Sequence, residues 1–164
     1  MLYTPGEVEK RATEYARKHS IQLGDRLGFG ADGIVHATNR QSAVKTHGRL
    51  PTYARERDVY LRLQEHEVRD ILGFAIPRLV VYDDDLWVIE MGMVKPPFVL
   101  DFGKSYLDEV PEFPEETLAE VEAENRERFD KRWPEVRRIL RKLESYGVFH
   151  VDVSPNNIRF AEEE

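Results

Sequence analysis

The chain has 164 residues, of which 41% are hydrophobic and 34% charged, and its formal net charge is -7. This length suits one domain or two small lobes, and the apolar fraction is enough for a packed core, which argues against general disorder. The acidic balance argues against nonspecific binding to nucleic acid, which requires clustered positive charge. The sequence contains no cysteine, which excludes disulfides and thiolate metal sites and fits a reducing cytoplasm.

The sequence predicts neither a signal peptide nor a membrane span. Residues 1–10 are mixed and charged, without the apolar run of a secretion signal. The most apolar stretch, residues 74–82, includes Pro77 and Arg78 and is far too short to cross a bilayer. We therefore expect a cytoplasmic protein that does not bind membranes.

The first predicted element is a helix that ends near His19. Thr4 and Glu7 have the spacing of a capping box, with Pro5 at the first helical position. Apolar residues then recur on one helical face, at Val8, Ala12, Tyr15 and Ala16.

Strands and a single helix are predicted next. Three β-like runs cover residues 21–27, 34–38 and 42–46, and the short link before the third favours a hairpin. A helix is expected over residues 52–67, with apolar positions at Tyr53, Val59, Tyr60 and Leu63. Two further apolar runs on either side of three aspartates predict a second hairpin, over residues 79–82 and 86–89.

The second half is expected to be helical after an irregular connection. Residues 94–114 hold four of the nine prolines and predict that connection. A helix over residues 115–130 is indicated by Leu118, Val121, Asn125 and Phe129. Another begins near Pro134, and Gly147 is placed to end it; its apolar face is formed by Val136, Ile139, Leu140 and Leu143. We expect Leu118, Val121 and Phe129 to cover that face in a compact two-helix lobe, or a second copy to cover it in a dimer.

A glycine-rich segment follows the first helix. Residues 27–35, Leu-Gly-Phe-Gly-Ala-Asp-Gly-Ile-Val, fit the pattern G-x-G-x-x-G-x-V. Glycines let a backbone fold closely over phosphates, and the expected nucleotide contacts are Leu27, Gly28, Gly30, Gly33 and Val35. In isolation the motif also fits a glycine-containing hairpin. Because β-branched residues rather than a helix follow it, the segment favours a phosphate-binding loop between two strands over a dinucleotide-binding turn.

Ala43 and Lys45 lie on the next predicted strand. Ala43 would give a base a small apolar contact, and Lys45 would reach phosphates. Alone, Lys45 would be an ordinary surface lysine, so its interpretation as a site residue requires an anionic partner. Glu56 on the following helix is the candidate, and Asp58 and Glu65 compete with it.

Residues 150–157, His-Val-Asp-Val-Ser-Pro-Asn-Asn, place Asp152 and Asn157 five positions apart. This loop, with the glycine segment, Lys45 and Glu56 before it, resembles the catalytic machinery of the eukaryotic-like protein kinase superfamily, and of its small bacterial members in particular. The resemblance covers roughly residues 21–160.

The resemblance implies an α+β, protein kinase-like fold. An antiparallel sheet with one helix would form the N-lobe, and a minimal helical C-lobe would follow it. The expected parts are an N-terminal helix over residues 1–20, an N-lobe over 21–93, and a truncated C-lobe over 94–164 that ends just after the catalytic loop.

The resemblance also implies roles for individual residues, with ATP and Mg²⁺ as cofactors. Asp152 would orient a substrate hydroxyl, Asn157 would bind magnesium, and His150 would brace the loop. Lys45 and Glu56 would form the ion pair that positions the phosphates. At the hinge, backbone groups of Glu90 and Gly92 would bond the adenine, with Ile89 behind it.

The sequence departs from the kinase pattern in one main respect. Kinases carry a D-F-G motif after the Asn, and its Asp binds magnesium, but this sequence continues for only seven residues past Asn157. The tripeptide Asp101-Phe102-Gly103 precedes the catalytic loop, and because chain order normally fixes position in a fold, we interpret it as unrelated. Asp32 places a negative charge on the glycine loop, which weakens phosphate binding unless a metal screens it.

Three functions therefore stay open. The protein is an ATP-binding serine/threonine protein kinase-like phosphotransferase of weak or absent activity, a pseudokinase module that acts through protein partners, or a split kinase completed by another chain. We expect a nucleotide ligand, and a protein partner or a homodimer, but no nucleic acid and no membrane.

Overall fold

The computed structural model describes residues 3–151 and 153–162. Its central element is a five-stranded antiparallel sheet with the order β1-β2-β3-β7-β6. The strands are β1 (Leu23–Phe29), β2 (Gly33–Thr38), β3 (Ser42–His47), β6 (Leu79–Asp83) and β7 (Val88–Gly92). The two predicted hairpins are therefore confirmed, and β7 joins them by pairing with β3.

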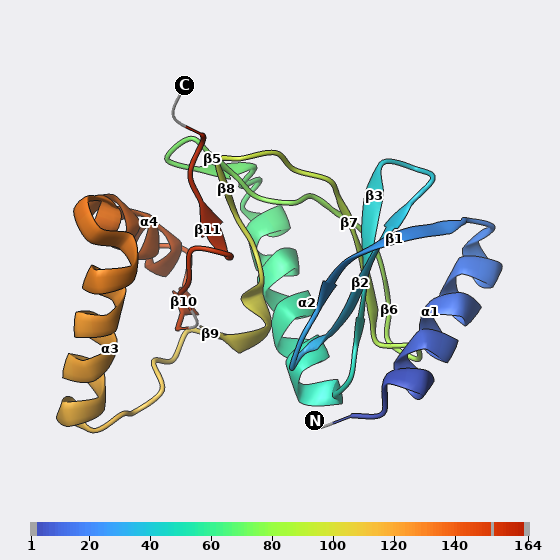
Figure 1. Cartoon of the computed structure of the whole chain (residues 1–164), viewed down its shortest axis with the longest axis horizontal. Helices are drawn as coiled ribbons and strands as arrows, with labels where there is room; N and C mark the ends of the chain where they lie inside the picture. The colour runs from blue at the N-terminus through green and yellow to red at the C-terminus, as the bar shows by residue number, and fades with distance from the viewer. Residues whose placement is uncertain (1–2, 152, 163–164) are drawn as a thin grey trace.

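One helix packs on each face of this sheet (Figure 1). Helix α1 (Pro5–His19) buries Tyr15 and Ala16 against Val44 and Val88. Helix α2 (Leu50–Glu65) buries its apolar residues against the opposite face, with Ala43, Ile89 and Met91. The alternation of side chains along a strand assigns each residue of β3 and β7 to one of these faces.

The remaining strands form two smaller sheets, in which β8, β9, β10 and β11 find partners far along the chain. A four-stranded sheet has the order β11-β8-β5-β4, and a two-stranded sheet pairs β10 with β9. These short strands are β4 (Asp70–Ile71), β5 (Phe74–Ala75), β8 (Phe98–Val99), β9 (Ser105–Leu107), β10 (Val148–His150) and β11 (Ile158–Arg159). In Figure 1, β8 and β11 lie side by side next to α2.

Residues 94–114 are more regular than the sequence predicted. They contain β8, the 3-10 helix η1 (Phe102–Lys104) and β9. Strands of two or three residues have no readable period, and their partners lie far along the chain, so the prolines alone suggested an irregular connection.

Helices α3 (Glu115–Phe129) and α4 (Trp133–Glu144), joined by η2 (Asp130–Arg132), form the predicted helix pair. Ile139 and Leu143 are fully buried, and Phe129 helps to cover them as expected. The expected cover from Leu118 and Val121 is wrong, because these side chains are 52% and 42% exposed. Trp133 and Val148 belong to the cluster that encloses Ile139 and Leu143 instead.

Two local predictions about the helices have different outcomes. At the start of α1, the carbonyl of Thr4 accepts bonds from the N–H groups of Glu7 and Val8, but its side chain makes no cap, so the capping-box prediction is wrong. Gly147 follows α4 with a φ of 76°, a conformation that favours glycine.

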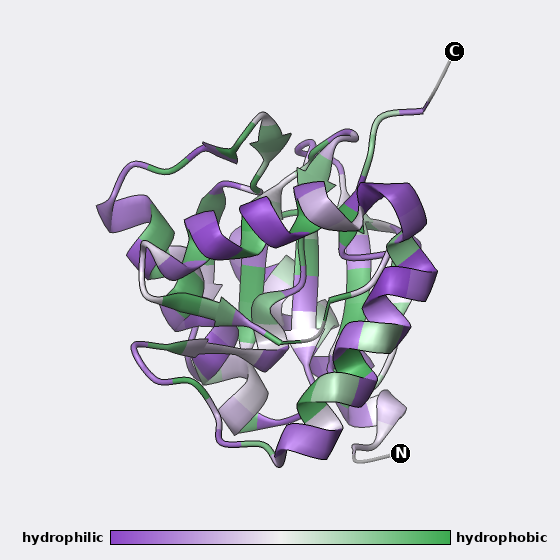
Figure 2. Ribbon diagram, turned by 90° about the vertical axis from the view of Figure 1, so that its left-hand side faces the viewer, coloured by the Kyte–Doolittle hydropathy of each residue, from purple (hydrophilic) through white to green (hydrophobic). Residues whose placement is uncertain are grey.

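The described chain is thus an α+β protein built on an antiparallel sheet with a few helices. Figure 2 shows apolar positions along the inner strands and mostly polar positions on the outer faces of the helices. None of the helices in the described ranges is long and apolar enough to cross a membrane.

Candidate functional site

A cavity lies between the β1–β2 turn and the paired strands β8 and β11. It consists of two adjoining hollows of about 420 Å³ and 600 Å³, which share Lys45, Leu100, Asp101 and Asn157 among their lining residues. The smaller hollow is bounded by apolar side chains, and the larger one by the glycine turn and polar groups. The residues that give the smaller hollow its apolar character are Leu27, Val35, Ala43, Met91, Phe98 and Leu100.

The glycine turn closes one side of the cavity. Gly33 has a φ of 154°, and a Cβ there would lie 2.1 Å from the carbonyl oxygen of Thr46, so this position requires glycine. Gly30 donates its N–H to the carbonyl of Gly33 at 3.1 Å, while a Cβ on Gly30 would meet nothing within 4 Å. Within this turn, packing therefore requires glycine at Gly33 but not at Gly30, where the space above the backbone is open.

Lys45 is the buried cation of the site. Its Nζ lies 2.8 Å from Glu56 Oε2, so the predicted pair forms. The competing acids do not reach it: Asp58 pairs with Arg57, and Glu65 is exposed at the end of α2. Burial lowers the pKa of Lys45, but the charges of Glu56 and Asp101 outweigh burial and leave that pKa above its usual range.

Glu56 is equally enclosed. Burial raises the pKa of its carboxyl, but the charge of Lys45 and the hydrogen bond from His47 outweigh burial and lower that pKa to about 2. The carboxylate is therefore ionised at neutral pH, and Lys45 stays charged beside it.

Asp101 also contacts Lys45, with Oδ1 3.0 Å from Nζ. The sequence interpretation treated residues 101–103 as unrelated to the kinase motif because they precede the catalytic loop, yet the fold brings this segment beside that loop. Strand β8 runs antiparallel to β11, and the N–H of Leu100 donates to the carbonyl of Asn157 at 2.7 Å. Strand pairing, not chain order, thus brings Asp101 and Asn157 to the same end of the cavity.

A chain of aromatic contacts holds the segment that carries Asp101. The ring of Phe102 packs edge-on against Tyr60 at 5.4 Å and lies 5.4 Å from the ring of His150. Ser105 Oγ is 2.9 Å from His150 Nδ1, and the Tyr60 hydroxyl donates to Met91 Sδ at 3.5 Å. His150 therefore braces the residues after Asp101, in keeping with its predicted supporting role.

The polar end of the cavity gathers oxygen groups around Lys45. Asn157 is buried, and its backbone N–H donates to the carbonyl of Ser154 at 3.0 Å. Asp32 lines the same hollow, and burial raises its pKa, with Lys45 opposing that rise. Asp152, predicted as the catalytic acid–base, lies outside the described residues.

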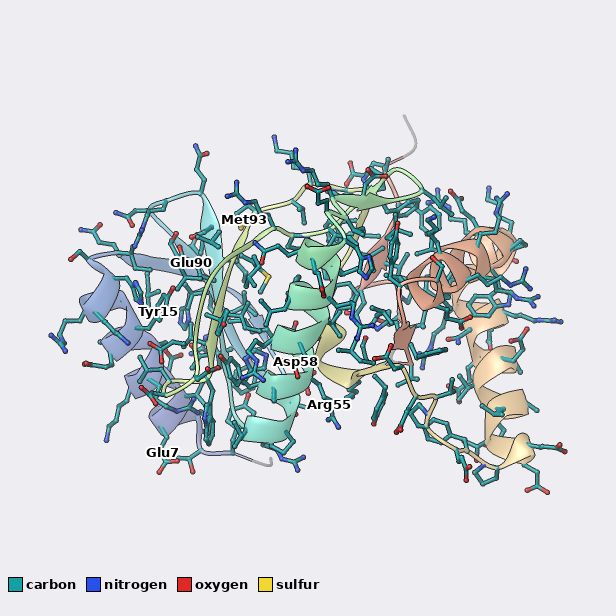
Figure 3. All side chains as sticks on the ribbon, turned by 180° about the vertical axis from the view of Figure 1, so that it is seen from behind. Glu7, Tyr15, Arg55, Asp58, Glu90 and Met93 are labelled. Carbon is teal, nitrogen blue, oxygen red and sulfur yellow. The ribbon has the colours of Figure 1, made fainter. Side chains whose placement is uncertain are left out.

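The hinge prediction places Ile89, Glu90 and Gly92 at the adenine. Met91 and Gly92 are the β7 residues that line the cavity. The carboxylate of Glu90 instead faces α1, where Tyr15 donates to it at 2.6 Å and Ser42 at 2.7 Å (Figure 3). The N–H of Gly92 donates to the carbonyl of Arg78 at 2.8 Å.

Most predicted site residues meet at this cavity. They are Leu27, Gly28, Gly30, Gly33, Val35, Ala43, Lys45, Glu56, Gly92 and Asn157. Sequence reasoning missed Asp101, Phe98 and Arg159, which also line it. The tripeptide at residues 101–103 was the signal that could have found Asp101.

The described residues contain no group of three or more His, Cys, Asp and Glu side chains arranged to hold a metal ion. A hard cation bound between Asp101 and Asn157 would therefore need further oxygens from its ligand, as Mg²⁺ commonly takes from phosphates.

No protein-family model matches this chain, and a search of curated proteins finds no match to it. What the cavity binds is therefore inferred from the chemistry of the residues around it.

Proposed function

We propose that this protein is a kinase-like phosphotransferase that binds ATP in this cavity and transfers its terminal phosphoryl group to a hydroxyl. The observation that carries the proposal is the buried Lys45, held between Glu56 and Asp101 directly beneath an open glycine turn. A lysine fixed in this way is costly to bury, which makes an anionic ligand above it a strong explanation for its retention.

The apolar hollow fits a nucleobase. Leu27, Val35 and Ala43 line it from the sheet, and Phe98 and Leu100 line it from the opposite side. Residues 91–94 line its edge, so the base would lie against them, slightly farther along the chain than the resemblance predicted.

The polar hollow fits magnesium and the phosphates. Asp101 and Asn157 would hold the cation, which would neutralise charge on the phosphates, and the glycine turn would lie over the phosphates. Asp32 is then compatible with the phosphates because the cation offsets its charge. With Asp101 in this role, the proposed site would regain the metal-binding carboxylate that the kinase pattern places after the Asn.

By the resemblance to protein kinases, Asp152 would act on the hydroxyl that receives the phosphoryl group. Its carboxylate would accept or orient the proton of the attacking hydroxyl, while Lys45 stabilises charge on the transferred group.

Calorimetric titration with ATP, with and without Mg²⁺, tests the binding part. We expect magnesium-dependent binding that is lost in Lys45→Ala and loses its magnesium dependence in Asp101→Asn. Asp58→Asn is the matched control, because Asp58 lies on α2, pairs with Arg57 and does not line the cavity, and this variant should bind as the wild type does. If Lys45→Ala and Asp101→Asn bind ATP as the wild type and the control do, the proposed site is contradicted.

Turnover separates catalysis from binding. Phosphate transfer or ATP hydrolysis that disappears in Asp152→Ala supports the enzyme, while ATP binding without turnover in any condition favours a binding module.

One observation favours that second function, a module that acts through a second copy of itself. A groove of about 490 Å³ lies between α3 and α4, beside His150, Val151 and Val153. Val110 and Phe113 on its rim are 60% and 44% exposed. Residues 109–124 carry seven glutamates and no basic residue, whereas residues 131–142 carry six basic residues and one acid. Two copies related by a twofold axis would place each acidic edge against the other's basic edge.

Sedimentation velocity over a range of protein and salt concentrations tests the dimer. We expect a dimer that weakens with salt and is lost in Arg137→Glu/Arg141→Glu, but not in Leu72→Ser, which changes an exposed residue in the β4–β5 turn. A monomer at every concentration would exclude this second function.

A further inference from the structure

We propose that His47 donates hydrogen bonds from both ring nitrogens and is the positioning residue that fixes Glu56 on Lys45. The effect of His47 on ATP binding rests on the proposed function, whereas its hydrogen-bond geometry does not. His47 lies two residues after Lys45 on β3, on the same face of the sheet, and its side chain is completely buried.

Both nitrogens of the ring face oxygen acceptors. Nε2 lies 2.6 Å from Glu56 Oε2, and Nδ1 lies 3.2 Å from the carbonyl oxygen of Trp87. A carbonyl cannot donate, and the carboxylate of Glu56 is ionised. A neutral imidazole carries one N–H and would leave one of these contacts between two acceptors, so the geometry requires the doubly protonated ring.

Protonated His47 offsets negative charge around Glu56. Lys45 and His47 would carry two positive charges, against the carboxylates of Glu56 and Asp101 and the nearby carboxyl of Asp32. A neutral His47 would leave an excess negative charge beside the phosphate site. Such an excess is unfavourable in a buried cluster and would repel an anionic ligand.

His47 and Lys45 converge on one oxygen. Oε2 of Glu56 receives Lys45 Nζ at 2.8 Å and His47 Nε2 at 2.6 Å. Because the histidine ring is held at its other nitrogen, it restricts where that oxygen can lie, and the oxygen in turn places the ammonium of Lys45. His47 therefore acts on the phosphate site through Glu56 without lining the cavity.

The groups around His47 come from every neighbouring element. Helix α2 contributes Glu56 and the edge of the Tyr53 ring, whose centroid is 5.5 Å away. From α1, Arg11 donates to the backbone carbonyl of His47 at 2.8 Å and lies over the Trp87 ring at 4.6 Å. The N-terminal helix thus helps to hold the carbonyl that His47 bonds.

Nitrogen-15 NMR of the wild-type protein tests the geometry directly. We expect both ring nitrogens of His47 to show attached protons in the folded protein, because both face oxygen acceptors. A single N–H, in either tautomer, would overturn the inference. This measurement needs no nucleotide, so it decides the donor state even if the protein proves not to bind ATP.

The second test compares ATP with adenosine in His47→Gln. Glutamine can still donate to Glu56 but cannot keep the charge, so we expect ATP to bind roughly tenfold more weakly while adenosine binds unchanged. His36→Gln is the matched control, because His36 is also buried but contacts Glu9 on α1, outside the cluster. Both ligands should bind that variant normally.

Comparing the loss of ATP binding with the loss of adenosine binding in His47→Gln separates a positioning role from a merely structural one. An equal loss of ATP and adenosine in His47→Gln would show a merely structural role and would count against the positioning proposal. Absence of binding by the wild type would instead reject the proposed function and leave the NMR result to stand alone.

Discussion

The two faces of the central sheet each bury a carboxylate, and they satisfy it in different ways. On the α2 face, Glu56 meets the charges of Lys45 and His47. On the α1 face, Glu90 meets only the hydroxyls of Tyr15 and Ser42. The charged cluster borders the cavity, and the hydroxyl cluster does not. Buried ion pairs are weak devices for stability alone, so the contrast indicates that the α2 face retains its charges for a ligand.

Removing the charge of Glu56 should have the largest effect. Glu56→Gln gives Lys45 and His47 a neutral acceptor in place of their common negative charge, and we expect a loss of about 3 kcal/mol in the free energy of unfolding, measured in urea. ATP affinity should fall as well. The double variant Lys45→Met/Glu56→Leu should recover part of the stability without recovering binding. If Glu56→Gln is as stable as the wild type, the contrast between the two faces of the sheet does not hold.

Acid should weaken the α2 face through the same carboxyl. The pKa of Glu56 is lowered in the folded state, to about 2, from an unfolded value near 4.5. Its stabilising contribution is therefore present above about pH 4.5 and is lost as pH falls toward 2. Unfolding free energies measured across that interval should decline more steeply for the wild type than for Glu56→Gln, and parallel curves would argue against this assignment.

Tyr15→Phe tests the α1 face. Removing the hydroxyl leaves Glu90 with Ser42 as its remaining side-chain donor, so we expect a loss of about 2 kcal/mol in unfolding free energy. ATP affinity should not change. Burial and the bond to Glu90 raise the pKa of Tyr15, so its contribution is present below pH 10 and is lost at higher pH. A fall in ATP binding would mean that the two faces are coupled.

The smallest effect is expected for Ser42→Ala. Its hydroxyl donates to Glu90 at 2.7 Å, and the neighbouring Thr38 hydroxyl lies 2.6 Å from it. Loss of one donor among several should cost about 1 kcal/mol in thermal or urea unfolding. A cost comparable to that of Glu56→Gln would show that hydroxyls and charges matter equally on the two faces.

Local sequence patterns were enough to predict most of the secondary structure. Four helices and the two hairpins were predictable because apolar spacing and turn residues act within a few positions of one another. The pairing of Lys45 with Glu56 was also predictable, since the buried helix face at Tyr53 and Tyr60 turns Glu56 toward the sheet.

The missing parts depend on distant contacts. Strands β8 and β11 are two residues each, and only their pairing places Asp101 beside Lys45. The orientation of Glu90 was not readable from the sequence alone, because strand alternation assigns Met91 rather than Glu90 to the face of Lys45 only once the register of β3 and β7 is known. That register is itself a tertiary property.

The pairing of β8 with β11 has a consequence for how the protein folds. Closing the loop between Val99 and Ile158 means ordering much of the second half of the chain before the two strands gain their contacts. The hairpins of the main sheet close far shorter loops. We therefore expect the sheet side of the cavity to form early in folding, and the corner with Asp101 and Asn157 to be assembled last.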